Sequence, residues 1–365
     1  MDGSSLFSLQ RRERIMAELG AHGAIRVTEF ARLLGISEMT VRRDINHLAQ
    51  QGLVSRVHGG ATIRSPMDRS VPVSAKLGRY TIGMVVPSLD YYWPHVVYGA
   101  RAEAVESQSR IALRGSSYDI KDDRRQIQAL VDSASTHALI VAPNAFGRAG
   151  QDMLRWLESL PIPVVLAERQ VPSDLVVRNL ESVGTDHPYG ASLAVHHLHA
   201  TGHRRLALFY PPASPTSVGV MRGWRDTIER LGMPAGVVAE YDDTLAGTER
   251  DEMYDGLIDQ CLDAQVTAVL ILADPSAVAF VQRCLDRGVR VPHDLAVVAY
   301  DDEVAYLGSP AISAVRPPKQ YVGRMAVRLA LARLTEGAER PLHHVRLEPQ
   351  LQVRDSSRGR VAVDA

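Results

Sequence analysis

Apolar residues in the first sixth of the chain recur three and four positions apart, which is the spacing of short amphipathic helices. Phe30, Leu33 and Leu34 would share one face of a helix. Gly35 follows them and can carry the backbone through a tight turn. The pattern therefore predicts a helix that ends at Gly35, with a turn into a second helix.

The second helix is predicted to begin after Ser37, a residue type that caps helix N-termini. Its inward stripe would hold Val41, Ile45 and Leu48. At about 100° per residue the other side chains face outward or lie on the flanks, and a helix of this kind fits the major groove of DNA. The alternative is an ordinary helix pair with a solvated basic face. The candidate DNA-contacting residues are Ser37, Met39, Thr40, Arg42, Arg43, Asn46 and His47.

A strand and a glycine turn are predicted after this helix. Residues 53–57 have the composition of a strand, and Gly59 and Gly60 would form the turn of a wing. Such a wing would bring Arg56, His58 and Gly59 toward the phosphate backbone. A further amphipathic helix over 11–19 would complete a small core, which favours a winged helix-turn-helix over an isolated helix pair.

The charge distribution supports a nucleic-acid partner. Residues 1–80 carry 12 Lys and Arg but only 7 Asp and Glu. The whole chain has 41 basic and 42 acidic residues, so the remainder carries 29 basic and 35 acidic ones. A basic segment before an acidic body is the footprint of a DNA-binding domain. We therefore expect double-stranded operator DNA as a partner.

Two motifs in this segment carry a family resemblance. One is the Thr-hydrophobic-Arg-Arg-Asp sequence of 40–44, and the other is Arg-Val-His-Gly-Gly-Ala at 56–61. With them, residues 11–61 resemble the DNA-binding domain of the DeoR family of bacterial repressors. The sugar-phosphate sensor that this family carries behind the domain is not evident in the rest of the sequence.

Composition indicates a globular protein with more than one domain. The chain has 365 residues, of which 45% are hydrophobic and 23% charged. A head over 1–63 and a Pro- and Ser-containing linker over 64–79 precede a core over 80–357. No apolar run approaches the ~20 residues of a membrane span, and the N-terminus lacks a signal-peptide profile. We expect a cytoplasmic protein without a membrane partner, in which Cys261 and Cys284 are buried thiols.

From Tyr80 onward, short apolar runs alternate with helical patterns. Fully apolar strands separated by amphipathic helices predict an α/β fold with parallel sheets covered on both faces. Ligands of such folds bind at the carboxyl ends of the strands. The predicted strands are 81–87, 110–116, 138–144, 163–169, 205–211, 268–274 and 295–302.

The order of these segments resembles the effector-binding core of the LacI family, which is shared with type I periplasmic sugar-binding proteins. The matching pieces are 82–87, 202–207, 223–225, 291–302 and 347–356. The resemblance implies two similar lobes with a ligand in the cleft between them. The first lobe would span about 80–184 and 315–336, the second about 185–314 and 340–357, with crossings near 183–186, 313–315 and 335–341.

The resemblance also implies a set of ligand-binding residues. Tyr92 and Trp93 would stack on the ligand, although an aromatic pair beside a strand also packs in cores. Carboxylates would accept hydrogen bonds from ligand hydroxyls, and that of Asp301 would equally suit a helix cap. The family's pocket arginine is replaced by Val220, and a common asparagine by Ala273, so we expect a neutral, sugar-like effector. The ligand-binding set is Tyr92, Trp93, Asp119, Glu168, Arg222, Asp274 and Asp301.

Other chemistries find little support in the sequence. The cluster of His196, His197, His199 and His203 has no accompanying Cys or carboxylate at a recognised ligand spacing, so we expect no metal. Neither a glycine-rich loop followed by lysine nor a nucleophile elbow is present. We therefore expect no cofactor and no enzymatic activity.

The sequence predicts a ligand-controlled transcription factor, a repressor of a carbohydrate or related catabolic operon. A homodimer would present two recognition helices to half-sites ~34 Å apart or a multiple of that. The helix over 95–107 has more apolar residues than one face needs, which suits either a dimer contact or burial against its own sheet. The alternative function is a solute-binding or sugar-phosphate-metabolising protein with an incidental basic head.

Overall fold

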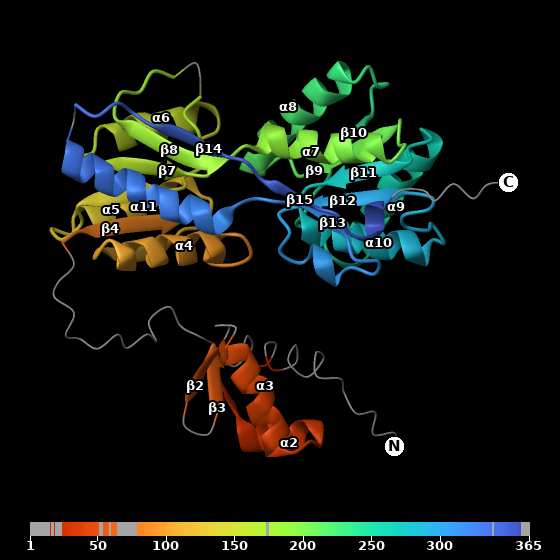
Figure 1. Ribbon diagram of the computed structural model, residues 1–365, viewed down its shortest axis with the longest axis horizontal. Helices are drawn as coiled ribbons and strands as arrows, with labels where there is room; N and C mark the ends of the chain where they lie inside the picture. Colours follow the sequence, from red (N-terminus) through yellow and green to blue (C-terminus); the bar gives the residue numbers. More distant parts are fainter. Residues whose placement is uncertain are drawn as a thin grey trace. The chain divides into compact units, whose positions relative to one another are not determined.

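Two compact units, Met1–Leu77 and Gly78–Ala365, make up the chain. The helices and strands of each unit are shown in Figure 1. Of the helix predicted over 11–19, only positions 15 and 18 are described, and Ile15 is buried. The computed structural model describes residues 15, 18, 24–50, 54–57, 60–63, 79–172, 175–337 and 339–358.

The described part of the N-terminal unit includes helices α2 and α3 and a small antiparallel sheet, and positions 15 and 18 are also helical. Helix α2 (Val27–Leu34) and helix α3 (Glu38–Gln50) are joined by a turn at Gly35, which has a φ of +65°. The sheet has the order β1 (Ala24–Arg26), β3 (Gly60–Ile63), β2 (Val54–Val57). The predicted second helix and strand are therefore present. The buried core contains Ile15, Ile25, Val27, Phe30, Ala31, Val41, Ile45 and Leu48.

Two details of the predicted head are wrong. Leu33 is 59% exposed rather than on the apolar face, because Val27, Phe30 and Ala31 form the inward stripe of α2. Gly60 is the first residue of β3 and pairs with Val57, so it belongs to the strand and not to the turn.

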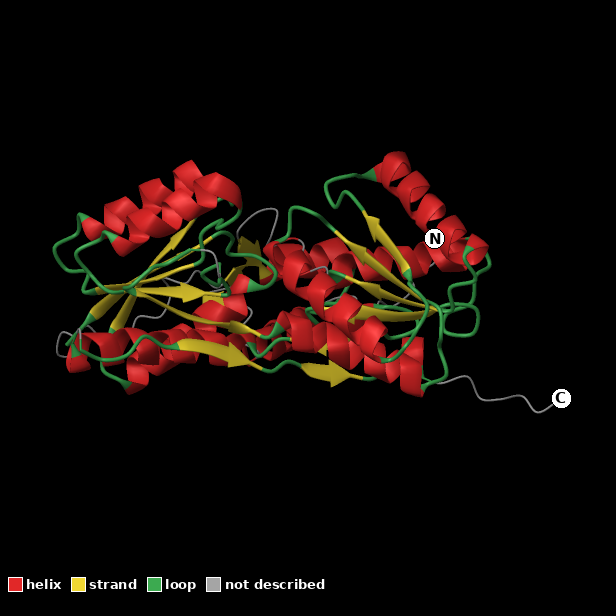
Figure 2. Cartoon of the chain, turned by 90° about the horizontal axis from the view of Figure 1, so that it is seen from above, coloured by secondary structure: helices red, strands yellow, loops and turns green. Residues whose placement is uncertain are grey.

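The second unit folds into two α/β lobes, and in each lobe a six-stranded sheet lies between layers of helices (Figure 2). The first lobe has the strand order β14-β8-β7-β6-β4-β5, all parallel. Its strands are β4 (Thr81–Val86), β5 (Arg110–Gly115), β6 (Ala138–Val141), β7 (Val164–Ala167), β8 (Leu180–Thr185) and β14 (His344–Leu347). Its helices are α4 (Trp93–Glu106), α5 (Ile120–Val131), α6 (Gly147–Glu158) and α11 (Lys319–Glu336).

The second lobe has the strand order β10-β9-β11-β12-β13-β15, parallel except for the last pair. Its strands are β9 (Leu206–Tyr210), β10 (Val237–Glu240), β11 (Ala268–Ile271), β12 (Ala296–Tyr300), β13 (Ser313–Arg316) and β15 (Gln350–Gln352). Its helices are α7 (His187–Ala200), α8 (Pro215–Arg230), α9 (Gly247–Asp263) and α10 (Asp274–Asp286), with short 3-10 turns η1 (Ala305–Leu307) and η2 (Asp355–Ser357).

Each predicted strand of the core contains an observed one, and the predicted fold class is confirmed. Burial explains this agreement, because β4, β6, β7, β9, β11 and β12 are buried along their whole length and therefore apolar in sequence. The apolar pattern did not identify β8, β10, β13, β14 or β15. Strands β10, β14 and β15 are only partly buried. Strand β8 and most of β13 are buried, but they carry polar residues such as Glu181, Ser182 and Ser313, which interrupt the apolar pattern.

Helices α4 and α11 cross at two glycines. A Cβ atom on Gly99 would lie 1.8 Å from the carbonyl oxygen of Gln320, and one on Gly323 would lie 1.9 Å from that of Val96. The close approach brings the apolar face of α4 onto α11 within the first lobe, where Val96, Val97, Ala100 and Ala104 are buried.

The chain passes between the lobes three times. The first crossing is at Asp186, between β8 and α7, inside the predicted range. The second lies after β13, at 317–318, and not at 313–315. The third lies at 348–349, between β14 and β15 (Figure 1), and the crossing expected near 335–341 is wrong. The cause is the pairing of β14 with β8, a long-range contact that local sequence patterns do not encode.

Candidate functional site

Helix α3 begins at a side-chain cap. The Ser37 Oγ accepts a hydrogen bond from the Thr40 amide at 3.2 Å and lies 2.9 Å from the Thr40 Oγ1. The predicted inward stripe of Val41, Ile45 and Leu48 is buried. The cap and the stripe together fix the first turns of the helix, which are the turns that approach base edges in helix-turn-helix proteins.

The face of α3 opposite the core is exposed as predicted. Met39 is 70% exposed, Arg43 and Asn46 are exposed, and Thr40 is half-buried. Arg42 forms an exposed ion pair with Glu38, with 3.3 Å between Nη2 and Oε2. Such an exposed pair contributes little to stability, so breaking it costs little.

The wing is described only in part. Arg56 lies in β2 opposite Ala61 of β3. The side chains of His47 and Arg56, and the whole of His58 and Gly59, lie outside the described residues.

A cavity of about 450 Å³ lies between the lobes of the second unit. This volume is within the range of small-molecule sites. The first lobe contributes residues that follow β6 and β7, and the second contributes the first turns of α7 and α8. Its lining includes Phe146, Gln151, Glu168, Arg169, His187 and Arg222.

The side chain of Glu168 is buried where it lines this cavity. Its Oε1 accepts hydrogen bonds from the Tyr92 hydroxyl at 2.6 Å and the Thr185 hydroxyl at 2.9 Å. Its Oε2 accepts from the Thr185 amide at 2.9 Å and lies 3.6 Å from the His187 Nε2. Burial raises the pKa of Glu168, but His187 and these hydrogen bonds outweigh it and hold that pKa at about 2. The carboxylate is therefore ionised, and protein groups fill most of its acceptor positions.

Two arginines line the cavity in different ways. Arg169 is buried, and its guanidinium donates to the carbonyl oxygens of Pro143 at 2.9 Å and Glu168 at 2.8 Å. Burial lowers the pKa of Arg169. Arg222 is exposed on α8, whereas Val220, at the family's arginine position, is buried in the second lobe's core.

Three of the sequence-predicted ligand residues lie elsewhere in the first lobe. The Tyr92 hydroxyl is bonded to Glu168, as described above. Trp93 is 3% exposed in the lobe core, edge-to-face with Tyr92. Asp119 is exposed and caps α5, accepting from the Lys121 amide at 2.7 Å. None of the three lines the cavity, so the structure brings only Glu168 and Arg222 of the predicted set to it.

Asp274 and Asp301 lie together in the second lobe. Asp274 is fully buried at the start of α10, and its Oδ2 accepts the amides of Glu303, Val304 and Ala305 at 2.6–2.9 Å. Asp301 is 8% exposed and has a φ of +97°. Its side chain meets the Tyr91 hydroxyl of the other lobe rather than capping a helix.

Sequence reasoning missed several residues of this site. Phe146, Arg169 and His187 line the cavity, and Tyr91 joins the lobes. Arg169 stands beside Glu168 at a predicted strand end and His187 directly follows the first crossing, so taking every residue of the strand ends into the ligand-binding set would have included both. Tyr91 carries no such signal, because its partners lie more than 180 residues away in the chain.

Two of the four histidines noted in the sequence, His197 and His203, have ordinary hydrogen-bond partners. His203 Nδ1 lies 3.0 Å from the Thr267 hydroxyl, and His197 Nε2 lies 2.8 Å from the Ser357 hydroxyl. Within the described parts of the chain, no three His, Cys, Asp or Glu side chains are placed to hold a metal ion. Among those same residues no helix is both long and apolar enough to cross a bilayer.

Comparison with known proteins matches both units to families. Residues 11–67 match the DeoR-like helix-turn-helix domain, and residues 195–357 match the periplasmic binding protein-like domain. Both resemblances predicted from the sequence are therefore confirmed.

Similar proteins include several transcriptional regulators. The arabinose metabolism transcriptional repressor of Geobacillus stearothermophilus is 24% identical over 338 residues, 90% of each chain. The transcriptional regulator CelR of Thermobifida fusca is 34% identical over 212 residues, 54% of this chain and 59% of that one. Two solved structures share the fold: a CelR–cellobiose complex, with 22% identity, a TM-score of 0.65 and coverage of 94% and 99%, and a LacI-family regulatory protein from Chloroflexus aggregans, with 22% identity, a TM-score of 0.66 and coverage of 76% and 98%.

Proposed function

We propose that a small molecule controls the DNA binding of this chain. The chain is a DNA-binding transcriptional regulator that joins a DeoR-like helix-turn-helix domain to a periplasmic binding protein-like core. It acts as a repressor and binds operator DNA through the exposed face of α3 and the wing. A small molecule binds in the cavity between the lobes of the core and changes operator affinity.

One observation carries this proposal: residues of both lobes line a single cavity of about 450 Å³. A molecule bound there contacts the first lobe through residues near Glu168 and the second through residues near Arg222. It therefore favours one arrangement of the lobes over others. An effector controls DNA binding only through such a difference in affinity between states.

The effector is proposed to be a neutral, sugar-like molecule. Arg169 donates to two main-chain carbonyls, and Val220 replaces the family's arginine and is buried, so neither offers a guanidinium fork to an anion. The names of similar proteins refer to arabinose, ribose and cellobiose. Arg222 is the cation on the cavity wall that would favour an anionic sugar instead, and a ligand screen decides between the two.

We further propose that the chain acts as a homodimer on a pseudo-palindromic operator. Most apolar residues of α4 are buried in their own lobe, as the alternative in the sequence analysis held. Val105 is 72% exposed at the end of the same helix. Light scattering that finds a monomer both free and on DNA would contradict the dimer.

Two linked experiments test the function. Selection from random duplexes identifies the operator, and a thermal-shift screen of sugars, sugar phosphates and nucleosides identifies the effector. A ligand at 100 times its Kd raises the unfolding free energy by about 2.7 kcal/mol. The proposal expects enrichment of one sequence and a stabilising neutral sugar. Failure to enrich any sequence would contradict DNA recognition, and a sugar phosphate as the tightest ligand would contradict neutrality.

A further inference from the structure

The two lobes also meet at a polar cluster that does not line the cavity. Tyr91, His95 and Lys319 come from the first lobe. The Tyr91 hydroxyl bonds to Asp274 Oδ1 and lies 3.2 Å from Asp301 Oδ2. His95 Nε2 lies 3.0 Å from the Glu303 Oε2, and Lys319 donates to the same carboxylate and to the Asp301 carbonyl. This interlobe cluster consists of Tyr91, His95 and Lys319 with Asp274, Asp301 and Glu303.

Counting protons shows how Tyr91 is held. A phenol has one proton to donate, yet two carboxylates contact its oxygen. If both carboxylates were ionised, one would face an oxygen lone pair without a hydrogen between them. The contact is favourable on both sides only when one carboxyl is protonated and donates to the phenol, while the phenol donates to the other.

The surroundings identify which carboxyl holds the proton. Burial raises the pKa of Asp274 as it does that of Asp301, but the Asp274 Oδ2 accepts three main-chain amides of 303–305, an arrangement that favours its ionised form. Asp301 is nearly buried beside that negative charge. Burial and the charge of Asp274 raise the pKa of Asp301 to about 7.

We propose that Tyr91 is an interlobe latch, which holds the core closed without a ligand through a chain of hydrogen bonds from protonated Asp301 to the Tyr91 oxygen and from Tyr91 to ionised Asp274. This proposal goes beyond the proposed function, because the Tyr91 hydroxyl, and not a bound ligand, holds the two lobes together. Tyr91 is a positioning residue and does not line the cavity.

The latch weakens when Asp301 loses its proton. The charge that results opposes Asp274, while two basic groups nearby, Lys319 and His187, offset it in part. The other titratable groups that face Asp301 are phenols and carboxyls. The full set around it is Tyr91, Tyr92, Glu168, His187, Asp274, Tyr300 and Lys319. Closure is therefore expected below about pH 7 and opening above it.

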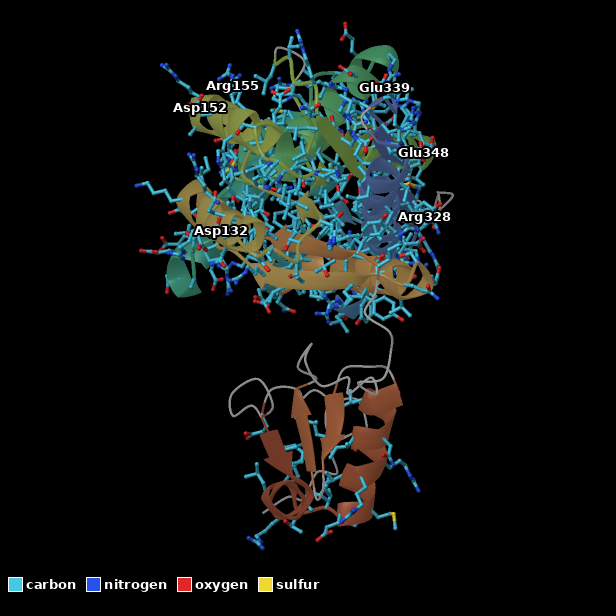
Figure 3. The ribbon with its side chains drawn as sticks, turned by 90° about the vertical axis from the view of Figure 1, so that its left-hand side faces the viewer. Asp132, Asp152, Arg155, Arg328, Glu339 and Glu348 are labelled. Carbon is cyan, nitrogen blue, oxygen red and sulfur yellow. The ribbon has the colours of Figure 1, made fainter. Side chains whose placement is uncertain are left out.

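Distance measurements between spin labels on the two lobes test the latch. Arg155→Cys on α6, whose side chain points outward (Figure 3), and Arg250→Cys on α9 place the labels. Cys261 and Cys284 are fully buried and remain unlabelled. The full-length labelled chain is diluted with unlabelled chain, so that each measured pair belongs to one molecule, and is examined at about pH 6 and about pH 8 without ligand.

The wild-type chain should be closed at the lower pH and shift to longer distances at the higher one. Tyr91→Phe should be open at both, with a roughly tenfold lower closed-to-open ratio at the lower pH. Asp301→Asn, whose amide donates to the phenol at any pH, should stay closed at both. Tyr306→Phe, at an exposed tyrosine, should follow the wild type.

Either of two results overturns the latch: a wild-type distance that does not change with pH, or a Tyr91→Phe distribution equal to that of the wild type at the lower pH. Neither result depends on operator or effector binding. Failure of the latch is thus distinguishable from failure of the proposed function.

Discussion

The Glu168 carboxylate and the His187 imidazole face each other across the first crossing between the lobes, with Oε2 3.6 Å from Nε2. Both residues line the interlobe cavity. Glu168 also holds Thr185, which lines the cavity, and Tyr92, which lies behind the cavity wall, through hydrogen bonds to its carboxylate. This carboxylate is therefore a structural centre of the cavity more than a direct acceptor for ligand hydroxyls.

Glu168→Gln should lower the free energy of unfolding by about 3 kcal/mol at neutral pH. The folded-state pKa of about 2 lies below the usual value of 4.5, so the stabilisation is complete above that usual value and is lost as pH falls through about 2. The difference between variant and wild type should therefore shrink across this acidic window. Urea titration followed by tryptophan fluorescence measures this difference, because Trp93 and Trp224 are buried and Trp156 is partly buried against a lobe core.

The matched control is Glu252→Gln, at an exposed carboxylate of α9. It should change stability by less than about 0.5 kcal/mol. If Glu168→Gln lowers the free energy of unfolding as much at about pH 3 as at neutral pH, the site requires the size or shape of the side chain and not its charge.

Gly323→Ala should destabilise the first lobe by roughly 1–3 kcal/mol or more. Its added methyl group would lie 1.9 Å from the Val96 carbonyl oxygen, so α4 and α11 would have to separate. Gly256→Ala in α9 is the control, because nothing lies within 4 Å of the added atom. It should stabilise by up to about 1 kcal/mol through helix propensity. Equal midpoints of unfolding for the two variants would refute the close helix crossing.

Arg43→Ala should weaken binding to the selected operator by about 1–3 kcal/mol, while binding to random duplexes changes less. Arg43 is exposed on the outward face of α3, where it can fork onto a guanine. Arg56→Ala in β2 should weaken all duplexes alike through a lost phosphate contact. Fluorescence anisotropy with both duplexes separates these outcomes. Equal losses for Arg43→Ala would assign it to phosphate contact instead of base recognition.

Local sequence patterns predicted the elements of this chain well. Buried strands such as β6 and β11 are apolar throughout, and Val41, Ile45 and Leu48 repeat at the period of a helix, so each pattern has one physical solution. Leu33 shows the limit of the method. The choice between Leu33 and Ala31 for the inward stripe of α2 depends on what packs against it, and the helix alone does not contain that information.

The candidate site could be predicted only to the level of strand ends. Glu168, Asp274 and Asp301 all follow or end strands as expected, but only Glu168 lines the cavity. Asp274 is taken up by the amides of Glu303, Val304 and Ala305, and Asp301 by Tyr91. Which carboxylate faces the cavity depends on loops that are distant in the sequence, as does the pairing of β14 with β8.

The most direct test of ligand control is operator affinity measured with and without a saturating effector in the wild type and in Val218→Trp. Val218 lines the cavity from α8 and is 55% exposed, so the larger side chain can fill the site without disturbing the lobe core. We predict that the effector changes wild-type operator affinity by roughly fivefold or more, and that Val218→Trp binds the operator normally but no longer responds. An effector that stabilises the wild type and yet leaves its operator affinity unchanged would contradict the account.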